Sequence, residues 1–263
     1  MKNYTDKEIL ELICSAEREA AGLIMQAKDV LAERKSSGRD VVTEYDRKVQ
    51  QLLMERFSTA LEDARFFCEE NDEQGDLSAE HVFIIDPIDG TMNFVQQLNH
   101  SCISVAYMSR GVLRAAAIYN PYVDEMFSAV LGEGAKLNGK AISASESNLS
   151  GSVVCCGTSP YYPQLADRGF ALMKEVFLNS LDLRRQGSAA LDLCSAASGR
   201  AGLYFELNTS LWDYAAGLLI VQESGGICLT CEGAPMPLDG RKSSVAAGSK
   251  KAVEDFLAIA KRI

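Results

Sequence analysis

Residues 83–94 read FIIDPIDGTMNF, and this stretch predicts a buried strand that ends in a turn and a helix start. The apolar run has the length of a buried strand, and the proline ends it because proline cannot donate to a strand ladder. The glycine permits the turn, and Thr91 is typical of a helix start. Two carboxylates, Asp86 and Asp89, therefore lie where a strand ends, directly before the free amides of a helix.

The chemistry of this stretch indicates bound metal ions and a phosphate. Carboxylates in such a position suit hard cations, which take oxygen ligands, and bare amides at a helix start suit a phosphate group. A strand that ends in an ordinary Asp-Gly turn with a threonine cap is the alternative interpretation. The second acid, the proline and Asn93 around the turn favour the metal and phosphate interpretation.

The length and charge of the chain argue against several classes of protein. The 263 residues suffice for one large domain or two small ones with a substantial core. The formal net charge of −10 argues against nucleic acid or an anionic membrane as a partner, because both require a basic face. A phosphate substrate is compatible with this charge where bound cations reverse the sign locally.

The N-terminal sequence and the cysteines indicate a cytoplasmic protein. The first residues lack the apolar core of a signal peptide, and no run reaches the length of a membrane span. The eight cysteines are scattered, mostly in apolar surroundings, as reduced cysteines often are. Cys228 and Cys231 have C-x-x-C spacing, but there is no second pair and the only histidines are His81 and His100, so zinc is not expected. We expect two strand cysteines on opposite faces.

Hydrophobic periodicity predicts a layered α/β fold in which helices alternate with two sheets. Residues 1–150 have the pattern of helices followed by an antiparallel sheet, and residues 151–263 alternate strands and helices. We expect these two parts to form one compact structural unit, with a weak boundary near Leu149. The expected helices lie at about 5–32, 41–61 (with Thr43 as a plausible N-cap), 162–179 and 250–261, with others that begin at 187 and 212. The expected strands lie at about 65–70, from 83, and at 101–109, 112–120, 125–131, 153–157, 181–185, 202–206, 226–230 and 244–247, and a polar break lies at 35–38.

The sequence D-P-I-D-G-T-x-N-F at 86–94 resembles the signature of the inositol monophosphatase family, the magnesium-dependent, lithium-sensitive sugar phosphatases. A second signature of that family, W-D-x-A-A-G, matches residues 212–217. Further family elements match T-E-Y-D at 43–46 and G-E-G-A-K-L-N-G at 132–139, whereas Cys68 replaces the glycine of a G-E-E element. The resemblance implies the αβαβα sugar-phosphatase architecture, and it is much less specific about the substrate.

The resemblance implies a site for two or three Mg²⁺ ions. The implied metal ligands are the carboxylates of Glu69, Asp86, Asp89 and Asp213 and the backbone carbonyl of Ile88. Glu69 and Thr91, with Asp46 behind Thr91, are implied to orient and deprotonate the attacking water. Taken alone, Asp46 and Asp213 are ordinary first-turn acids of helices, and Glu69 is a polar strand end.

The resemblance also implies where the substrate lies. The implied substrate- and phosphate-binding residues are Gly90, Thr91, Asp89, Ser188, Ala189 and Glu206. The amides after the Asp-Gly turn hold the phosphate, and Glu206 accepts hydrogen bonds from polyol hydroxyls. Taken alone, Glu206 is a strand-end acid, and Arg184 and Arg185 either meet a second phosphate or lie at the surface.

These expectations combine into one main hypothesis, a Mg²⁺-dependent phosphomonoesterase that hydrolyses a sugar or polyol phosphate, above all myo-inositol 1-phosphate. Fructose 1,6-bisphosphate and 3′-phosphoadenosine 5′-phosphate are the alternatives within the superfamily. A non-catalytic metal- or phosphate-binding module is the alternative from another class. Thr91 and Asp46 argue against such a module, because metal storage requires neither. The family is commonly dimeric, so a homodimer is expected.

Overall fold

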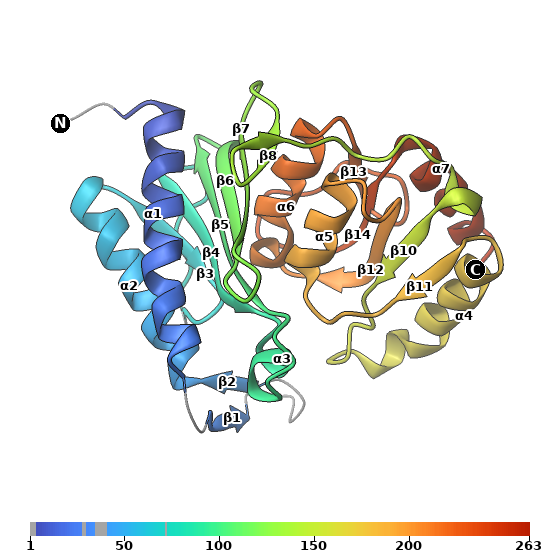
Figure 1. Cartoon of the computed structure of the whole chain (residues 1–263), viewed down its shortest axis with the longest axis horizontal. Coiled ribbons are helices and arrows are strands. Elements are labelled where there is room, and N and C mark those ends of the chain that lie inside the picture. Colours follow the sequence, from blue (N-terminus) through green and yellow to red (C-terminus); the bar gives the residue numbers. More distant parts are fainter. Residues whose placement is uncertain (1–3, 28–29, 35–40, 72) are drawn as a thin grey trace.

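The computed structural model describes residues 4–27, 30–34, 41–71 and 73–263, and Figure 1 shows their arrangement. The helices are α1 (Asp6–Met25), α2 (Glu44–Ala60), α3 (Thr91–Val95), α4 (Ala166–Leu178), α5 (Ala189–Ala197), α6 (Leu211–Glu223) and α7 (Lys250–Ala260), with 3₁₀ helices η1 (Leu149–Gly151) and η2 (Pro163–Leu165). α1 and α2 cover one face of a seven-stranded sheet, and α5 and α6 lie between it and a five-stranded sheet. α4 and α7 cover the outer face of the second sheet, which completes the predicted layered α/β fold.

The seven-stranded sheet contains the start of the first sequence signature, which continues into α3. Its strands, in spatial order, are β3 (Arg65–Cys68), β4 (Val82–Asp89), β5 (Cys102–Ser109), β6 (Val112–Asn120), β7 (Glu125–Val130), β8 (Ala135–Leu137) and β9 (Lys140–Ala141). The predicted antiparallel sheet is confirmed except that β3 runs parallel to β4. All residues of β4 are buried, because helices cover both faces of this sheet.

The segment between the first two helices differs from the prediction. The sequence predicts a helix to about residue 32, but α1 ends at Met25, and β1 (Ala32–Arg34) pairs antiparallel with β2 (Val41–Thr43). α1 packs on β5, β6 and β7, and the chain beyond it gains ladder hydrogen bonds with β2 instead of helical ones. The predicted polar break at 35–38 lies outside the described residues. Thr43 caps α2 as predicted.

The five-stranded sheet has mixed topology. Its strands, in spatial order, are β11 (Asp182–Arg184), β10 (Val153–Cys156), β12 (Leu203–Thr209), β14 (Ser243–Gly248) and β13 (Ile227–Leu229). β10 is parallel to both of its neighbours, whereas β14 is antiparallel to both of its neighbours. The helix predicted from residue 162 begins only at Ala166, because Pro163 opens a separate 3₁₀ turn before it. α5 and α6 pack against strands of both sheets.

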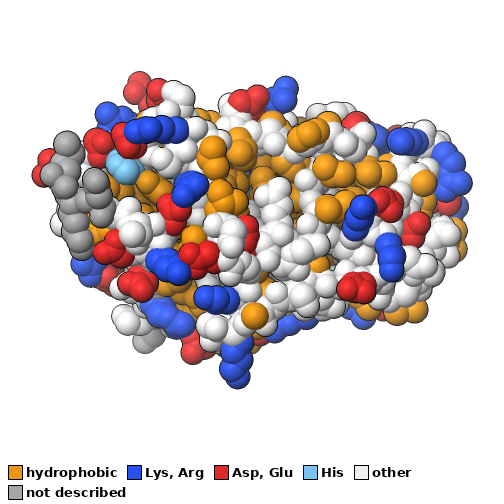
Figure 2. Space-filling model, turned by 90° about the horizontal axis from the view of Figure 1, so that it is seen from above, with side chains coloured by type: hydrophobic (Ala, Val, Ile, Leu, Met, Phe, Trp, Pro, Cys, Tyr) orange, Lys and Arg blue, Asp and Glu red, His pale blue; other side chains and the backbone are white. Residues whose placement is uncertain are grey.

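The cysteines are all free thiols, and Cys228 and Cys231 lie on opposite sides of the second sheet. Cys228 packs in the core between the sheets, and Cys231 packs in the outer core with α7. Cys231 nevertheless lies outside β13, because the strand gives way to a turn in which Thr230 and Ala234 pair. Among the described residues, no helix combines the length and the apolar character that crossing a membrane requires. Acidic and basic side chains are interspersed on the face shown in Figure 2.

Candidate active site

A cavity of about 600 Å³ is lined by the segments that follow β4 and β12 and by the first residues of α5 and α6. These segments come from both halves of the chain, so the cavity lies where the two halves meet. Both sequence signatures contribute to its lining. The contributing residues are Asp86, Ile88, Asp89, Gly90, Thr91, Met92 and Asn93 from the first signature and Trp212 and Asp213 from the second.

The turn between β4 and α3 has the geometry that its sequence predicts. The pairing of β4 with β5 is interrupted between Asp86 and Asp89, where the proline lies, and this lets both carboxylates leave the ladder. Gly90 has a left-handed backbone with φ of 85°, and a Cβ atom there would lie 3.1 Å from the carbonyl oxygen of His100. Among the described residues, no side chain caps the start of α3. Within this part of the chain, the first amides of the helix therefore have no side-chain oxygen as a cap.

A chain of hydroxyl and carboxylate groups links α3 to the start of α2. The Thr91 hydroxyl lies 3.3 Å from Oδ1 of Asp46 and 3.0 Å from the carbonyl oxygen of Ile88. Asp46 accepts from both the amide and the hydroxyl of Thr43 through Oδ2, at 2.8 and 2.5 Å. Burial raises the pKa of Asp46 to about 6, against the lowering effect of the Thr43 hydrogen bonds. Asp46 lies in the first turn of α2 but is fully buried, so it is not the solvent-exposed acid that is common at such a position.

Four carboxylates from three segments line the same cavity: Glu69 directly after β3, Asp86 and Asp89 in β4, and Asp213 in α6. Burial raises the pKa of Asp86 well above its usual range, and the negative charges of the other three raise it further. Burial also raises the pKa of Asp213 well above its usual range, and the negative charges of Asp89 and Glu69 raise it further. A divalent cation relieves this repulsion, and an all-oxygen donor set suits magnesium.

Local hydrogen bonds hold two of these carboxylates in place. Oδ2 of Asp213 accepts from the amide of Ser210 at 2.6 Å and completes a capping box of α6. Oδ2 of Asp89 accepts from the Ser188 hydroxyl and from the amide of Ala190, the latter at 2.9 Å. In the described part of the chain, no three His, Cys, Asp or Glu side chains are already arranged to hold a metal ion. The all-oxygen donor set of these residues nevertheless fits magnesium by its chemistry.

Glu206 lines the cavity from β12, and its carboxylate is held from two sides. Oε1 accepts from the amide and the hydroxyl of Ser159, at 2.7 and 3.1 Å, and Oε2 accepts from the Tyr204 hydroxyl at 2.9 Å. Burial raises the pKa of Glu206 in spite of these donors. The carboxylate packs against the backbone of Gly157, where a Cβ atom would lie 1.7 Å from Oε2. Only a residue without a side chain leaves this space.

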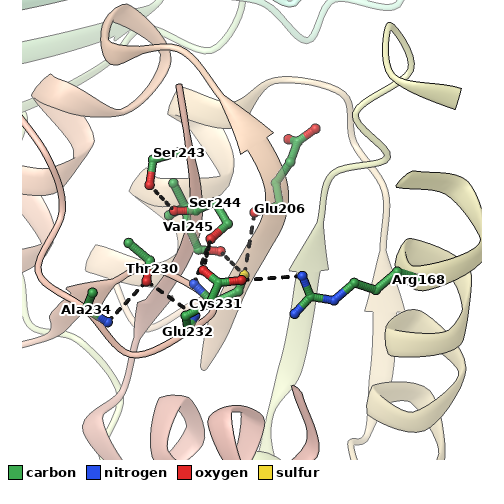
Figure 3. Close-up of polar contacts among 9 residues, drawn as sticks. All are labelled: Arg168, Glu206, Thr230, Cys231, Glu232, Ala234, Ser243, Ser244 and Val245. Atoms are coloured by element: carbon green, nitrogen blue, oxygen red, sulfur yellow. Dashed lines mark hydrogen bonds and ion pairs between the residues drawn. The ribbon is translucent and has the colours of Figure 1, made fainter. Parts of the chain in front are cut away.

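The backbone of Glu206 is held from the other side of the sheet. Figure 3 shows the Glu206 side chain directed away from Cys231, whose thiol donates to the carbonyl oxygens of Glu206 and Val245 at 3.6 and 3.3 Å. The amide of Cys231 donates to the Ser244 hydroxyl, which donates to Glu232 at 2.8 Å. The register of β12 and β14 shifts directly after the Glu206–Val245 pair. These contacts fix the strand at the point where its side chain enters the cavity.

The start of α5 lies against the first signature. Ser188 caps the helix and gives its hydroxyl proton to Asp89, so this side chain is committed to a neighbouring carboxylate. Ala189, the next residue, lines the cavity. Asn93 donates through Nδ2 to the carbonyl oxygens of His100 and Gln186, at 2.7 and 2.8 Å. Asn93 thus joins α3 to the segment before α5, which brings the two halves of the cavity together.

Sequence reasoning missed the residues around Glu206, namely Gly157, Ser159 and Tyr204. The glycine directly after β10 was the available signal, because a glycine at a strand end often marks a close approach. Ser159 has a left-handed backbone with φ of 42°, which is rare for a residue other than glycine and has no signature in the sequence.

Comparison with known proteins gives consistent matches. The sequence matches the model of the inositol monophosphatase family over residues 5–263. It is 35% identical to Nus factor SuhB from Pasteurella multocida (strain Pm70) over 223 aligned residues. These residues make up 83% of this chain and 84% of the relative. The structure is similar to that of extragenic suppressor protein suhB from Bartonella henselae, with a TM-score of 0.90, 28% identity and coverage of 97% and 98%. It is also similar to an IMPase/NADP phosphatase complexed with Mg²⁺ and phosphate, with a TM-score of 0.86, 25% identity and coverage of 97% and 96%.

Proposed function

Because the chain belongs to the inositol monophosphatase family, we propose that it is a Mg²⁺-dependent phosphomonoesterase acting on a small sugar or polyol phosphate, with inositol 1-phosphate as the reference substrate. The observation that supports this most is the convergence in one cavity of two buried carboxylates, Asp86 and Asp89, with the half-buried Glu69 and Asp213 and with the start of α3, which no side chain of the described residues caps. Carboxylates alone repel a phosphate, so this site requires cations to act on one.

The metal site in this proposal uses Glu69, Asp86, Asp89, Asp213 and the carbonyl oxygen of Ile88. Two or three bound magnesium ions supply positive charge against the phosphate and lower the pKa of a bound water. The relative crystallised with Mg²⁺ and phosphate supports the choice of metal. The raised pKa values of Asp86 and Asp213 support it as well, because burial and, after it, the charges of neighbouring acids disfavour the charged carboxylates, and a bound cation offsets both effects.

Thr91 and Asp46 orient the attacking water in this proposal, together with Glu69. The Thr91 hydroxyl has one proton, which it gives to Oδ1 of Asp46 or to the carbonyl oxygen of Ile88. Its lone pairs then accept a hydrogen bond from the water, which attacks phosphorus in line with the leaving oxygen. The amides of Gly90 and Thr91, beside Asp89, hold the phosphate during this step.

The leaving polyol is bound by the second half of the chain. Glu206 has four acceptor positions, of which Ser159 and Tyr204 take three, so one remains for a substrate hydroxyl. Ala189 lies beside the ring, and Ser188 acts through Asp89. A substrate that lacks the hydroxyl leaves a buried acceptor unpaired, and this loss gives selectivity.

A non-catalytic metal- or phosphate-binding module is the second candidate, and curated relatives bear the name Nus factor rather than phosphatase. The link between Thr91 and Asp46 argues against it, since holding a metal requires no such pair. We further propose a homodimer in the cytoplasm. The eight free thiols support a reducing compartment.

A phosphate-release assay on inositol 1-phosphate, with and without Mg²⁺, separates the two candidates. A phosphatase releases phosphate with the metal and stops when it is removed. A binding module takes up Mg²⁺ in calorimetry yet releases no phosphate from a panel that includes fructose 1,6-bisphosphate and 3′-phosphoadenosine 5′-phosphate. That second result would refute the enzymatic proposal.

A further inference from the structure

Ser104, in β5, has a buried hydroxyl group to which the proposed reaction assigns no role. The residue is 1% exposed, and its Oγ atom has no hydrogen-bond partner among the described residues. The large majority of buried polar groups in folded proteins have a partner, because an unpaired hydroxyl gives up its hydrogen bonds to water without replacement. The surroundings of Ser104 indicate which group this partner is.

The side chain of Ser104 lies on the same face of the sheet as that of Asp86. The two residues are directly paired in the register of β4 and β5. Side chains alternate along a strand, and the next ones on this face, Ile84 and Ala106, pack in the core between the two sheets. Directly opposite residues of an antiparallel pair have Cβ atoms about 5 Å apart, which a hydroxyl and a carboxylate can bridge. Ser104 therefore lies within reach of a proposed metal ligand.

The next pair in this register contains the contact that we infer for Ser104. Asp89 is paired with Cys102, and the Cys102 thiol donates to Oδ2 of Asp89 at 3.8 Å. β5 thus places a donor opposite each of the two aspartates of β4. Oδ1 of Asp86 accepts from the amide of Ile88 at 3.1 Å. A carboxylate has about four acceptor positions, so Asp86 can take a metal ion and a second donor as well.

We propose that Ser104 is a positioning residue, whose hydroxyl donates to Asp86 and orients this carboxylate for binding a metal ion. This inference rests on the proposed function and deepens it at the metal site. A hydroxyl forms a stronger hydrogen bond with a charged carboxylate than with a neutral group, so the contact favours the charged form that binds a cation. Groups that hold a metal-binding carboxylate from behind fix its orientation, and their loss lowers metal affinity by about 10- to 100-fold.

Two measurements on the variant Ser104→Ala test the proposal. The melting temperature in EDTA should equal or exceed that of the wild type, because the exchange removes a buried group without a partner. The affinity for Mg²⁺, measured by calorimetry, should fall by about tenfold or more. A serine with a merely structural role would lower the melting temperature and leave the affinity unchanged. Ser104→Cys, which keeps a weaker donor of the kind that Cys102 provides, should retain part of the affinity.

The matched control is Ser128→Ala, the same exchange at another buried serine of the seven-stranded sheet. Ser128 lies in β7, two strands away from β5, where it is paired with Ala117 and Lys136. This control should keep the wild-type affinity for Mg²⁺. Equal Mg²⁺ affinities of the wild type and Ser104→Ala would overturn the proposal, as would an equal loss in the control. A wild type that binds no Mg²⁺ would refute the proposed metal site and the role of Ser104 together. A wild type that binds Mg²⁺ but releases no phosphate would refute only the proposed catalysis.

Discussion

Gly157→Ala is expected to change substrate preference without touching a metal ligand or the reacting phosphate. The added Cβ atom would lie 1.7 Å from Oε2 and 2.0 Å from Cδ of Glu206, whereas real Cβ atoms essentially never lie closer than 3.0 Å to such an atom. The carboxylate must therefore move by at least 1.3 Å. The backbone conformation of Gly157 is open to alanine, because its φ is not positive. The main consequence is thus displacement of Glu206.

The size of the effect follows from the hydrogen bonds of Glu206. A shift of this size stretches the 2.7 Å contact with the Ser159 amide beyond hydrogen-bond range and moves the remaining acceptor position away from the substrate. The loss of one such bond to a polyol hydroxyl costs about 1–3 kcal/mol, or about 5- to 150-fold in kcat/KM. This loss should appear with inositol 1-phosphate and be much smaller with β-glycerophosphate, which lacks the ring.

The assay compares the two kcat/KM values in the wild type, in Gly157→Ala and in a control, Gly169→Ala. Gly169 lies in α4, where an added Cβ atom meets only the Leu207 side chain at an ordinary 3.7 Å. The control should keep the wild-type ratio. An unchanged ratio in a folded Gly157→Ala protein would refute the assignment of Glu206 to the polyol. Equal losses of kcat/KM on both substrates would instead indicate that Glu206 supports the metal site.

Three further predictions concern the metal site. Chelation with EDTA should abolish phosphate release and added Mg²⁺ should restore it, whereas activity that persists in a metal-free sample would contradict a metal mechanism. Asp89→Asn should lower kcat by orders of magnitude with little change in the melting temperature, because asparagine can still accept from the amide of Ala190 but lacks the charge. A near-normal kcat and a near-normal Mg²⁺ affinity would show that Asp89 is only a turn residue. Lithium should inhibit by competing for a metal position, as the resemblance at residues 86–91 implies, and insensitivity would move the protein away from the inositol branch.

The parts of the fold and of the site that the sequence predicts are those with local causes. The turn after β4 requires a glycine at φ of 85°, and the Thr43 cap of α2 depends on contacts within three residues. The setting of Glu206 could not be predicted, because Gly157 and Ser159 come from the loop after β10 and Tyr204 comes from β12, far away in the sequence. No pattern along the chain indicates that these segments meet.

The errors have a similar origin. The prediction of a helix to residue 32 rests on apolar residues whose helical spacing continues past Met25. In the structure, residues 32–34 instead form β1, because they pair with β2 in a non-local interaction. The parallel pairing of β3 with β4 is also a non-local feature, and no residue of either strand indicates its direction. The division of the chain near residue 150 stays a prediction, although α5 and α6 pack against both sheets.

The two interpretations of the acids, as helix caps and as functional groups, turn out to be compatible in this structure. Asp46 and Asp213 each complete a capping box, and Asp89 accepts from the first turn of α5. Each helix start holds its carboxylate at a fixed angle, and each carboxylate in turn satisfies an amide that the helix leaves open. Replacing Asp213 with alanine therefore has two effects at once. It removes a helix cap, which costs about 1 kcal/mol of folding stability, and it removes any contribution of the carboxylate to metal binding. Only asparagine, which can still accept from the Ser210 amide, separates the charge of Asp213 from its role in starting α6.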